Sequence, residues 1–325
     1  MSSNSAKLSP LLNSVIAREL AVGITATLVF FFSMLLIPML GIFVGVFTPL
    51  PTLLSYYRWG SPLGLWVPGG AVLVGWLLFS YFSMAQSAPY LLEMVLLGLL
   101  LGIGMRRNWS LEKTVGTASI TAFIVGALIF WMAHNSSATG IFQEIEEGLR
   151  EAVRLTLEQY AGITAETRVL EESLDSVLPL LVRILPGASL ASALVISCLN
   201  LLVTKRYCTI RQLPLPTWGS WLQWKATEFL VWVVITSGFA LLMPFQLIKM
   251  TALNVLVVLG TVYLFQGLAV ITFFFERWKL PKIIRAVFYG FLLLQQFASL
   301  GAVLLGFFDV WFDFRRLSNK PASSA

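Results

Sequence analysis

The chain has 325 residues, of which 58% are hydrophobic and only 12% are charged, whereas soluble domains carry about 25% charged residues. Its net charge is +6, but no run of Lys and Arg is longer than two residues. Such scattered charge is typical of loops that flank membrane spans and excludes a nucleic-acid surface. The composition therefore indicates a polytopic membrane protein, with the lipid bilayer as its first partner.

The first part of the chain alternates short polar segments with long apolar ones. Residues 1–18 are polar and are expected to form a cytoplasmic N-terminal tail. A bilayer core about 30 Å thick needs roughly 20 helical residues. Residues 19–133 are therefore expected to form an N-terminal membrane bundle of five spans, at 19–37, 40–57, 63–84, 89–105 and 114–133. The first span is interpreted as a retained helix, since no small-residue cleavage site follows a short apolar core.

Residues 134–178 are a long polar stretch with nine acidic residues and three arginines. Apolar residues recur at every fourth position from Ile141 to Val153, which predicts an amphipathic helix. Gly162 and Thr164 are suited to ending this helix and capping a second short one. We therefore expect an external acidic helical hairpin. It serves either as a tether between two membrane halves or as a lid or docking element.

The C-terminal part is again apolar. A second membrane bundle is expected at residues 179–308, with spans at 179–204, 226–243, 250–275 and 286–308. Residues 309–325 are expected to form an interfacial helix and tail. The predicted fold is thus an all-α polytopic transmembrane helix bundle of about eight to nine spans, with one external amphipathic helical hairpin.

Basic residues orient the spans. With a cytoplasmic N-terminus and nine spans, fourteen Lys and Arg residues fall on the cytoplasmic side and seven outside, which is the expected direction of bias. This arrangement leaves Arg315, Arg316 and Lys320 outside. Either the basic tail is an exception, or one of the nine segments does not cross the membrane.

Residue types that enzymes use are scarce in this chain. His134 is its only histidine, which excludes paired-histidine metal motifs, and neither a nucleophile elbow nor a phosphate-binding loop occurs. Cys198 and Cys208 suggest neither a disulfide framework nor a metal site. We expect no enzymatic activity, no cofactor and no metal.

Ionisable groups inside predicted spans are better candidates for a site, because burying a charge in lipid is costly unless the charge is paired or hydrated. Glu93 and Arg183 each lie one turn inside the outer end of a span. They are expected either to form a buried ion pair or to line a polar cavity. Pro186 and Gly187 follow Arg183 and are expected to break or kink the helix, which would expose backbone groups to such a cavity.

Uncharged polar residues and glycines within the spans are interpreted as packing elements. Side-chain amides in spans usually form interhelical hydrogen bonds, and they occur at Asn200, Asn254, Gln266, Gln295 and Gln296. The spacings Gly41-x-x-x-Gly45 and Gly98-x-x-x-Gly102 allow helix backbones to approach closely. They indicate either ordinary packing or a seam for another membrane protein.

The C-terminal motif contains Asp309, Asp313 and Arg315 among bulky aromatic residues. On a continuous helix, Asp309 and Asp313 would share a face with Arg316 beside them. The aromatic rings favour an anchor at the membrane surface. The alternative is a latch, in which Asp309 reaches a basic partner elsewhere in the bundle.

Three local patterns resemble a known family. They are Thr48-Pro49-Leu50-Pro51 with Tyr57-Arg58-Trp59-Gly60, Gln266-Gly267-Leu268-Ala269-Val270-Ile271, and the run from Leu305 to Arg316 with its Asp-Phe-Arg element. Their order resembles the YybS-like family, uncharacterised multi-pass proteins of the bacterial inner membrane with a domain of unknown function. The resemblance further implies a distant relation to substrate-binding subunits of energy-coupling-factor transporters, in which a helix bundle encloses a small molecule.

Two hypotheses of function follow. The first is a small-molecule binding or transport subunit of a bacterial inner membrane, which would take a small-molecule ligand and a membrane-protein partner. The alternative is a membrane scaffold that recruits partners through its external hairpin. The first rests on the intramembrane charges, the expected break at Pro186 and Gly187, and the transporter resemblance.

Overall fold

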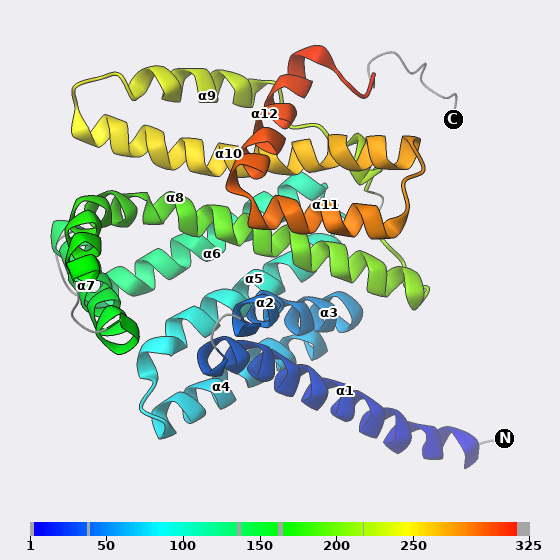
Figure 1. Cartoon of the computed structure of the whole chain (residues 1–325). Coiled ribbons are helices and arrows are strands. Elements are labelled where there is room, and N and C mark those ends of the chain that lie inside the picture. Colours follow the sequence, from blue (N-terminus) through cyan, green and yellow to red (C-terminus); the bar gives the residue numbers. More distant parts are fainter. Residues whose placement is uncertain (1–2, 38–39, 135–137, 162–164, 217, 317–325) are drawn as a thin grey trace. The chain divides into compact units, whose positions relative to one another are not determined.

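The structure is a computed structural model that describes residues 3–316 apart from 38–39, 135–137, 162–164 and 217. Every regular element within these ranges is a helix (Figure 1). The predicted all-α class is therefore confirmed. Hydrocarbon offers no hydrogen-bond partners to the backbone, whereas a helix pairs its own N–H and C=O groups. Long apolar segments inside a membrane therefore fold as helices.

The chain divides into two compact units. The first comprises residues 1–136 and 192–217, and the second comprises 137–191 and 218–325. Helix α8 (Ala165–Ile210) therefore contributes its first part to the second unit and its last part to the first. This division differs from the predicted one, because much of the segment 179–204 groups with the N-terminal helices.

In the first unit, helix α5 packs against three neighbours, α3, α4 and α6. The helices of this unit that precede α8 are α1 (Ser3–Leu36), α2 (Leu40–Gly45), α3 (Pro49–Trp59), α4 (Trp66–Tyr81), α5 (Ala88–Arg106) and α6 (Leu111–His134). A Cβ atom on Gly98 or Gly102 of α5 would collide with the backbone of α3. This glycine pair therefore serves close packing inside the chain.

Buried polar side chains join the last part of α8 to the rest of the first unit. The hydroxyls of Ser119 on α6 and Ser197 on α8 lie 2.9 Å apart. The side-chain amide of Asn200 donates a hydrogen bond of 2.9 Å to the carbonyl of Val46, which follows α2. The interpretation of Asn200 as an interhelical hydrogen-bond donor is thus confirmed.

The second unit is arranged around helix α10. Besides the first part of α8, it contains α7 (Ala138–Ala161), α9 (Phe229–Ala240), α10 (Gln246–Arg277), α11 (Lys282–Leu294) and α12 (Gln296–Phe312). Helix α10 packs against α9 and α12. Helix α8 runs without interruption from Ala165 to Ile210, whereas a short helix had been expected after Thr164. The residues between α7 and α8 lie outside those that the structure describes.

Among the described residues, seven helical segments are long and apolar enough to cross a membrane, or eight if the bent pair α11–α12 counts as one. The seven are Ser14–Leu36, Leu40–Trp59, Leu63–Tyr81, Ala85–Arg106, Leu111–Met132, Val177–Ile210 and Gln246–Arg277. The predicted range of about eight to nine spans is met at eight, and two of the nine expected segments differ from a single long helix. The segment 226–243 contains only the 12-residue α9, about 18 Å long at the helical rise, and the segment 286–308 is broken.

The break separates α11 from α12. The two helices are bent by 104°, and Gln295 between them is extended, with φ −107° and ψ 105°. The hydroxyl of Ser299 donates a hydrogen bond to the carbonyl of Leu292. That carbonyl belongs to the last turn of α11 and has lost its helical partner, so Ser299 satisfies an acceptor that the bend frees.

Helices α11 and α12 contact α10 in different ways. Helix α11 runs back beside α10, with the hydroxyls of Tyr289 and Thr272 2.7 Å apart. Helix α12 instead crosses α10 at two glycines (Figure 1). A Cβ on Gly267 would collide with the backbone of α12, and one on Gly306 with the carbonyl of Tyr263. The close crossing therefore depends on both glycines.

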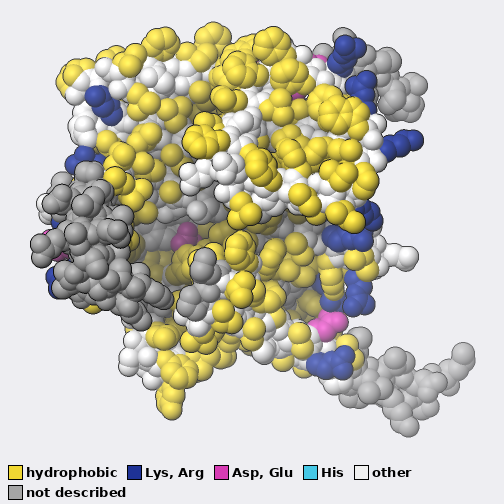
Figure 2. Space-filling view, in the orientation of Figure 1, with side chains coloured by type: hydrophobic (Ala, Val, Ile, Leu, Met, Phe, Trp, Pro, Cys, Tyr) yellow, Lys and Arg dark blue, Asp and Glu magenta, His cyan; other side chains and the backbone are white. Residues whose placement is uncertain are grey.

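Apolar side chains are widely exposed. Leu242, Leu247 and Leu294 are 80%, 80% and 87% exposed, and hydrophobic side chains cover most of the surface in Figure 2. Soluble proteins rarely expose large contiguous apolar patches. The surface is therefore that of a protein surrounded by lipid.

The close crossing of α12 over α10 at Gly267 and Gly306 gives a first prediction. Gly306→Ala places a methyl group against the carbonyl of Tyr263 and should lower the melting temperature of the detergent-solubilised protein. Gly301→Ala on the same helix is the matched control, since nothing lies within 4 Å of its Cβ position. It should be neutral or stabilising, because alanine favours a helix by roughly 1 kcal/mol over glycine. Equal melting temperatures for the two variants would contradict the close crossing.

Candidate functional site

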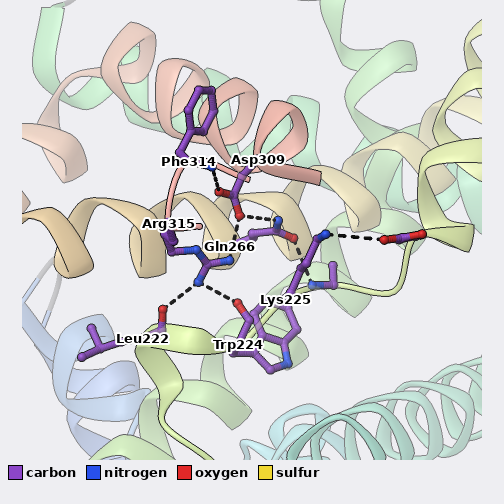
Figure 3. Close-up of polar contacts among 9 residues, drawn as sticks. Leu222, Trp224, Lys225, Gln266, Asp309, Phe314 and Arg315 are labelled. Atoms are coloured by element: carbon purple, nitrogen blue, oxygen red, sulfur yellow. Dashed lines mark hydrogen bonds and ion pairs between the residues drawn. The ribbon is translucent and has the colours of Figure 1, made fainter. Parts of the chain in front are cut away.

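Helix α12 ends in a buried carboxylate. Asp309 is fully buried, and its Oδ2 lies 2.7 Å from Nη2 of Arg315, which is also buried. Figure 3 shows the two side chains pointing toward each other. Removing a charge from water costs several kcal/mol, so a buried charge needs both a counter-charge and hydrogen bonds. The two residues supply the charge balance for each other.

The backbone reverses beyond α12, which brings Arg315 back to the carboxylate. Asp313, the residue after the helix, has a left-handed conformation with φ 39°. The helix therefore does not continue, and the expectation that Asp309 and Asp313 share a helix face with Arg316 is wrong. The reversal also lets the N–H of Phe314 donate to Oδ1 of Asp309 at 3.1 Å.

Arg315 also binds the segment that precedes α9. Its Nη1 donates to the carbonyls of Leu222 and Trp224 at 2.7 and 3.0 Å. Figure 3 shows the guanidinium between these carbonyls and the carboxylate. Leu222 lies in a single 3-10 turn, Trp221–Gln223, and Trp224 follows it, so both carbonyls need a donor from outside this turn, which Arg315 provides.

Gln266 completes the group from α10. Its Nε2 donates to Oδ2 of Asp309 at 3.1 Å, and its Oε1 accepts the N–H of Ala226 at 3.0 Å. Both ends of the amide are engaged, so its orientation is fixed. We call Asp309, Arg315 and Gln266, with the backbone groups they bind, the Asp309 cluster.

The contacts of the Asp309 cluster are those of a structural element that holds segments together. The carboxylate accepts hydrogen bonds from Arg315, Gln266 and the N–H of Phe314. A carboxylate held by these three donors in a buried position is poorly placed to act as a base or nucleophile. The cluster instead fixes three segments relative to one another: α10, the end of α12 and the chain leading into α9.

A second polar contact lies at Pro186 and Gly187. Of the two expected outcomes, a break or a kink, the break is not found, because α8 continues through both residues. Asn254 of α10 explains how the helix tolerates them. Its Oδ1 accepts the N–H of Gly187, and its Nδ2 donates to the carbonyl of Arg183 at 2.9 Å. These are the two groups that α8 would otherwise pair with each other, so a neighbouring helix satisfies the backbone around the proline.

Glu93 and Arg183 lie in different units, so their pairing remains a prediction. Within the first unit, Glu93 is half-buried, and its carboxylate lies against Gly126 of α6. Within the second, Arg183 has an exposed side chain, and its carbonyl binds Asn254. Among the described residues, no group of three or more His, Cys, Asp and Glu is arranged to hold a metal ion.

Sequence analysis pointed to several residues that form these contacts, but not to the partners that they bind. The interpretation of Asn254 and Gln266 as interhelical hydrogen-bonding residues is confirmed. The partners of Arg315 could not be predicted, because backbone carbonyls have no sequence signature. The close approach of Gly306 to α10 was also missed, since α12 contains no Gly-x-x-x-Gly spacing.

Comparison of the sequence with family models gives a match that extends over both units. The model of the family described as "Predicted membrane protein (DUF2232)" matches residues 25–310. The chain belongs to this DUF2232 family. The match includes Asp309 and Gln266, whereas Arg315 lies five residues beyond its end. No match was found among curated proteins or among solved structures. Family membership establishes a multi-pass membrane protein with a domain of unknown function.

The Asp309 cluster gives the second prediction. Asp309→Asn or Arg315→Gln alone leaves an uncompensated charge or an unpaired polar group. Each should destabilise the protein strongly, since breaking a buried ion pair costs about 3–5 kcal/mol. The double variant should lose less than the sum of the two. Melting temperatures in detergent provide the measurement.

The exposed pair Lys225–Glu228 is the control for this double-mutant cycle, with its charges 3.5 Å apart. Glu228→Gln should change stability by less than about 1 kcal/mol. Strictly additive losses for Asp309→Asn and Arg315→Gln would show that the two side chains do not act as a pair.

Proposed function

We propose that this DUF2232 protein is a small-molecule binding or transport subunit of a bacterial inner membrane. The observation that carries the proposal is the bent pair α11–α12, packed against α10 and held at its end by the Asp309 cluster. Discontinuous helices inside a membrane are a recurring way of building substrate sites, because they place helix ends and free backbone groups at membrane depth.

The contacts of the second unit support a topology in which α11–α12 does not cross. Arg315 at the end of the pair binds the carbonyls of Leu222 and Trp224, next to Lys225, which lies four residues before α9. In the same unit, Ala226 is level with Gln266 of α10. The stretch of α10 from Gln246 to Gln266 has about 20 helical residues and is about 30 Å long, which is one bilayer core, and the segment 226–245 leads along it to the start of α10. In this topology α9 with its flanks crosses, and the pair re-enters on the side from which it came.

The basic residues agree with this topology better than with nine spans. With a cytoplasmic N-terminus and eight crossings, seventeen Lys and Arg residues are cytoplasmic, four are external and Arg183 lies within a span. The tail residues Arg315, Arg316 and Lys320 then no longer conflict with the positive-inside rule.

The topology is tested with cysteine variants in a background that lacks Cys198 and Cys208. In intact cells, a membrane-impermeant thiol reagent should label Glu147→Cys on α7 but neither Asn108→Cys nor Arg316→Cys. Permeabilised cells, in which all three should react, provide the control. Labelling of Arg316→Cys in intact cells would show that α11–α12 crosses the membrane.

The binding or transport function is tested by a thermal-shift screen of the purified protein with vitamins and other metabolites. A saturable ligand is expected, and its absence would contradict the proposal. For the ligand found, a reducible bis-maleimide cross-linker between Thr272→Cys and Tyr289→Cys should pin α11 to α10, because these side chains meet through the tyrosine ring and their Cβ atoms are too far apart for a disulfide. This cross-link should abolish uptake by producing cells while binding persists, and reduction should restore uptake. The single Thr272→Cys variant is the control.

The alternative is a scaffold without enzymatic activity, favoured by the amphipathic, acidic helix α7. A scaffold would lose co-purifying membrane proteins when Glu147→Gln and Glu151→Gln are combined, whereas a transport subunit would keep its ligand. Loss of partners with no ligand in the screen would favour the scaffold.

A further inference from the structure

The first unit contains a pocket where α3, α5 and α8 end. Its volume is about 450 Å³. One wall is the end of α3 with Tyr57, another is the end of α5 with Arg106, and the third is the segment 213–215 after α8. The hydroxyl of Tyr57 donates to the carbonyl of Pro214. This bond ties the third wall to the first, so the pocket is built from segments that are joined to each other.

Arg106 is held at the wall of this pocket without a counter-charge. Its Nη1 donates to the carbonyl of Tyr57 at 3.1 Å. Its guanidinium packs against Gly60, where a Cβ would lie only 2.7 Å from Nε and from Nη2. Among the described residues, Arg106 forms no ion pair with a carboxylate. Its remaining N–H donors are therefore available to a ligand in the pocket.

Positive charge dominates this end of the first unit. The pocket itself is lined by Arg58 and Arg106, and the neighbouring ends of α5, α6 and α8 carry Arg107, Lys113, Lys205, Arg206 and Arg211 with one acidic residue, Glu112. Glu19 is already paired with Arg58, at 3.1 Å. A cleft lined by one sign of charge concentrates ions of the opposite sign.

We propose that this pocket binds a phosphate-bearing ligand through Arg106, supplied either as the head group of an anionic phospholipid or as a soluble phosphate ester. The planar guanidinium matches the geometry of phosphate oxygens. Met105, Leu213 and Leu215 provide apolar lining for the rest of the ligand. Trp59 is of the type that settles at head-group depth, and basic pockets between membrane helices bind anionic lipid head groups. This site is independent of the proposed transport function.

The test uses full-length protein, purified and delipidated in detergent. Phosphatidylglycerol and phosphatidylcholine are titrated in mixed micelles, and glycerol 3-phosphate is titrated in buffer. Binding is followed by native mass spectrometry and melting temperature. Arg106→Gln should weaken binding of the anionic ligand by at least tenfold while keeping the ligand-free melting temperature. Arg277→Gln, an exposed arginine at the end of α10, is the matched control and should bind as the unaltered protein does.

Two outcomes support the proposal and identify the source of the phosphate. Saturable binding of phosphatidylglycerol, with little binding of phosphatidylcholine, identifies a lipid head group. Binding of glycerol 3-phosphate that depends on Arg106 and competes with the lipid identifies a soluble ester. Unchanged binding by Arg106→Gln would overturn the proposal. So would an equal loss in Arg277→Gln, since it would indicate attraction by surface charge alone.

Discussion

The carboxylate of Asp309 has to be satisfied inside a protein whose surroundings are hydrocarbon, where an unpaired charge is far more costly than in water. It is satisfied by Arg315, Gln266 and the backbone N–H of Phe314. These donors come from α10 and from the reversed chain beyond α12. Through Arg315, the contacts extend to the carbonyls that precede α9. One buried charge thus fixes three segments of the second unit.

The same constraint accounts for the irregular parts of the helices. Pro186 interrupts the hydrogen bonds of α8 but does not end the helix, because Asn254 binds the backbone groups on either side of it. At the bend between α11 and α12, Ser299 binds a freed carbonyl of α11. In each place a side chain replaces a backbone bond that lipid could not replace, which allows bends and prolines at membrane depth.

Composition and apolar run length predicted the membrane class and most helices, since both depend on local sequence. They failed where tertiary contacts decide. The run 286–308 has the length and composition of one span, yet it bends at Gln295 because α12 crosses α10 through Gly267 and Gly306. The segment 226–243 has similar hydropathy but holds only a 12-residue helix. At the site, Asp309 and Arg315 were recognised as a motif, whereas their contact depends on the left-handed turn at Asp313, which the sequence does not signal.

The central claim is that the Asp309 cluster joins segments far apart in the chain, and hydrogen–deuterium exchange of the Gln266→Leu variant tests it most directly. The account predicts faster exchange in two distant peptides: residues 222–228, where Ala226 loses its acceptor, and residues 309–316, where the clamp on Asp309 loosens. Exchange in α5 of the first unit should not change. Faster exchange confined to α10 around residue 266 would contradict the account.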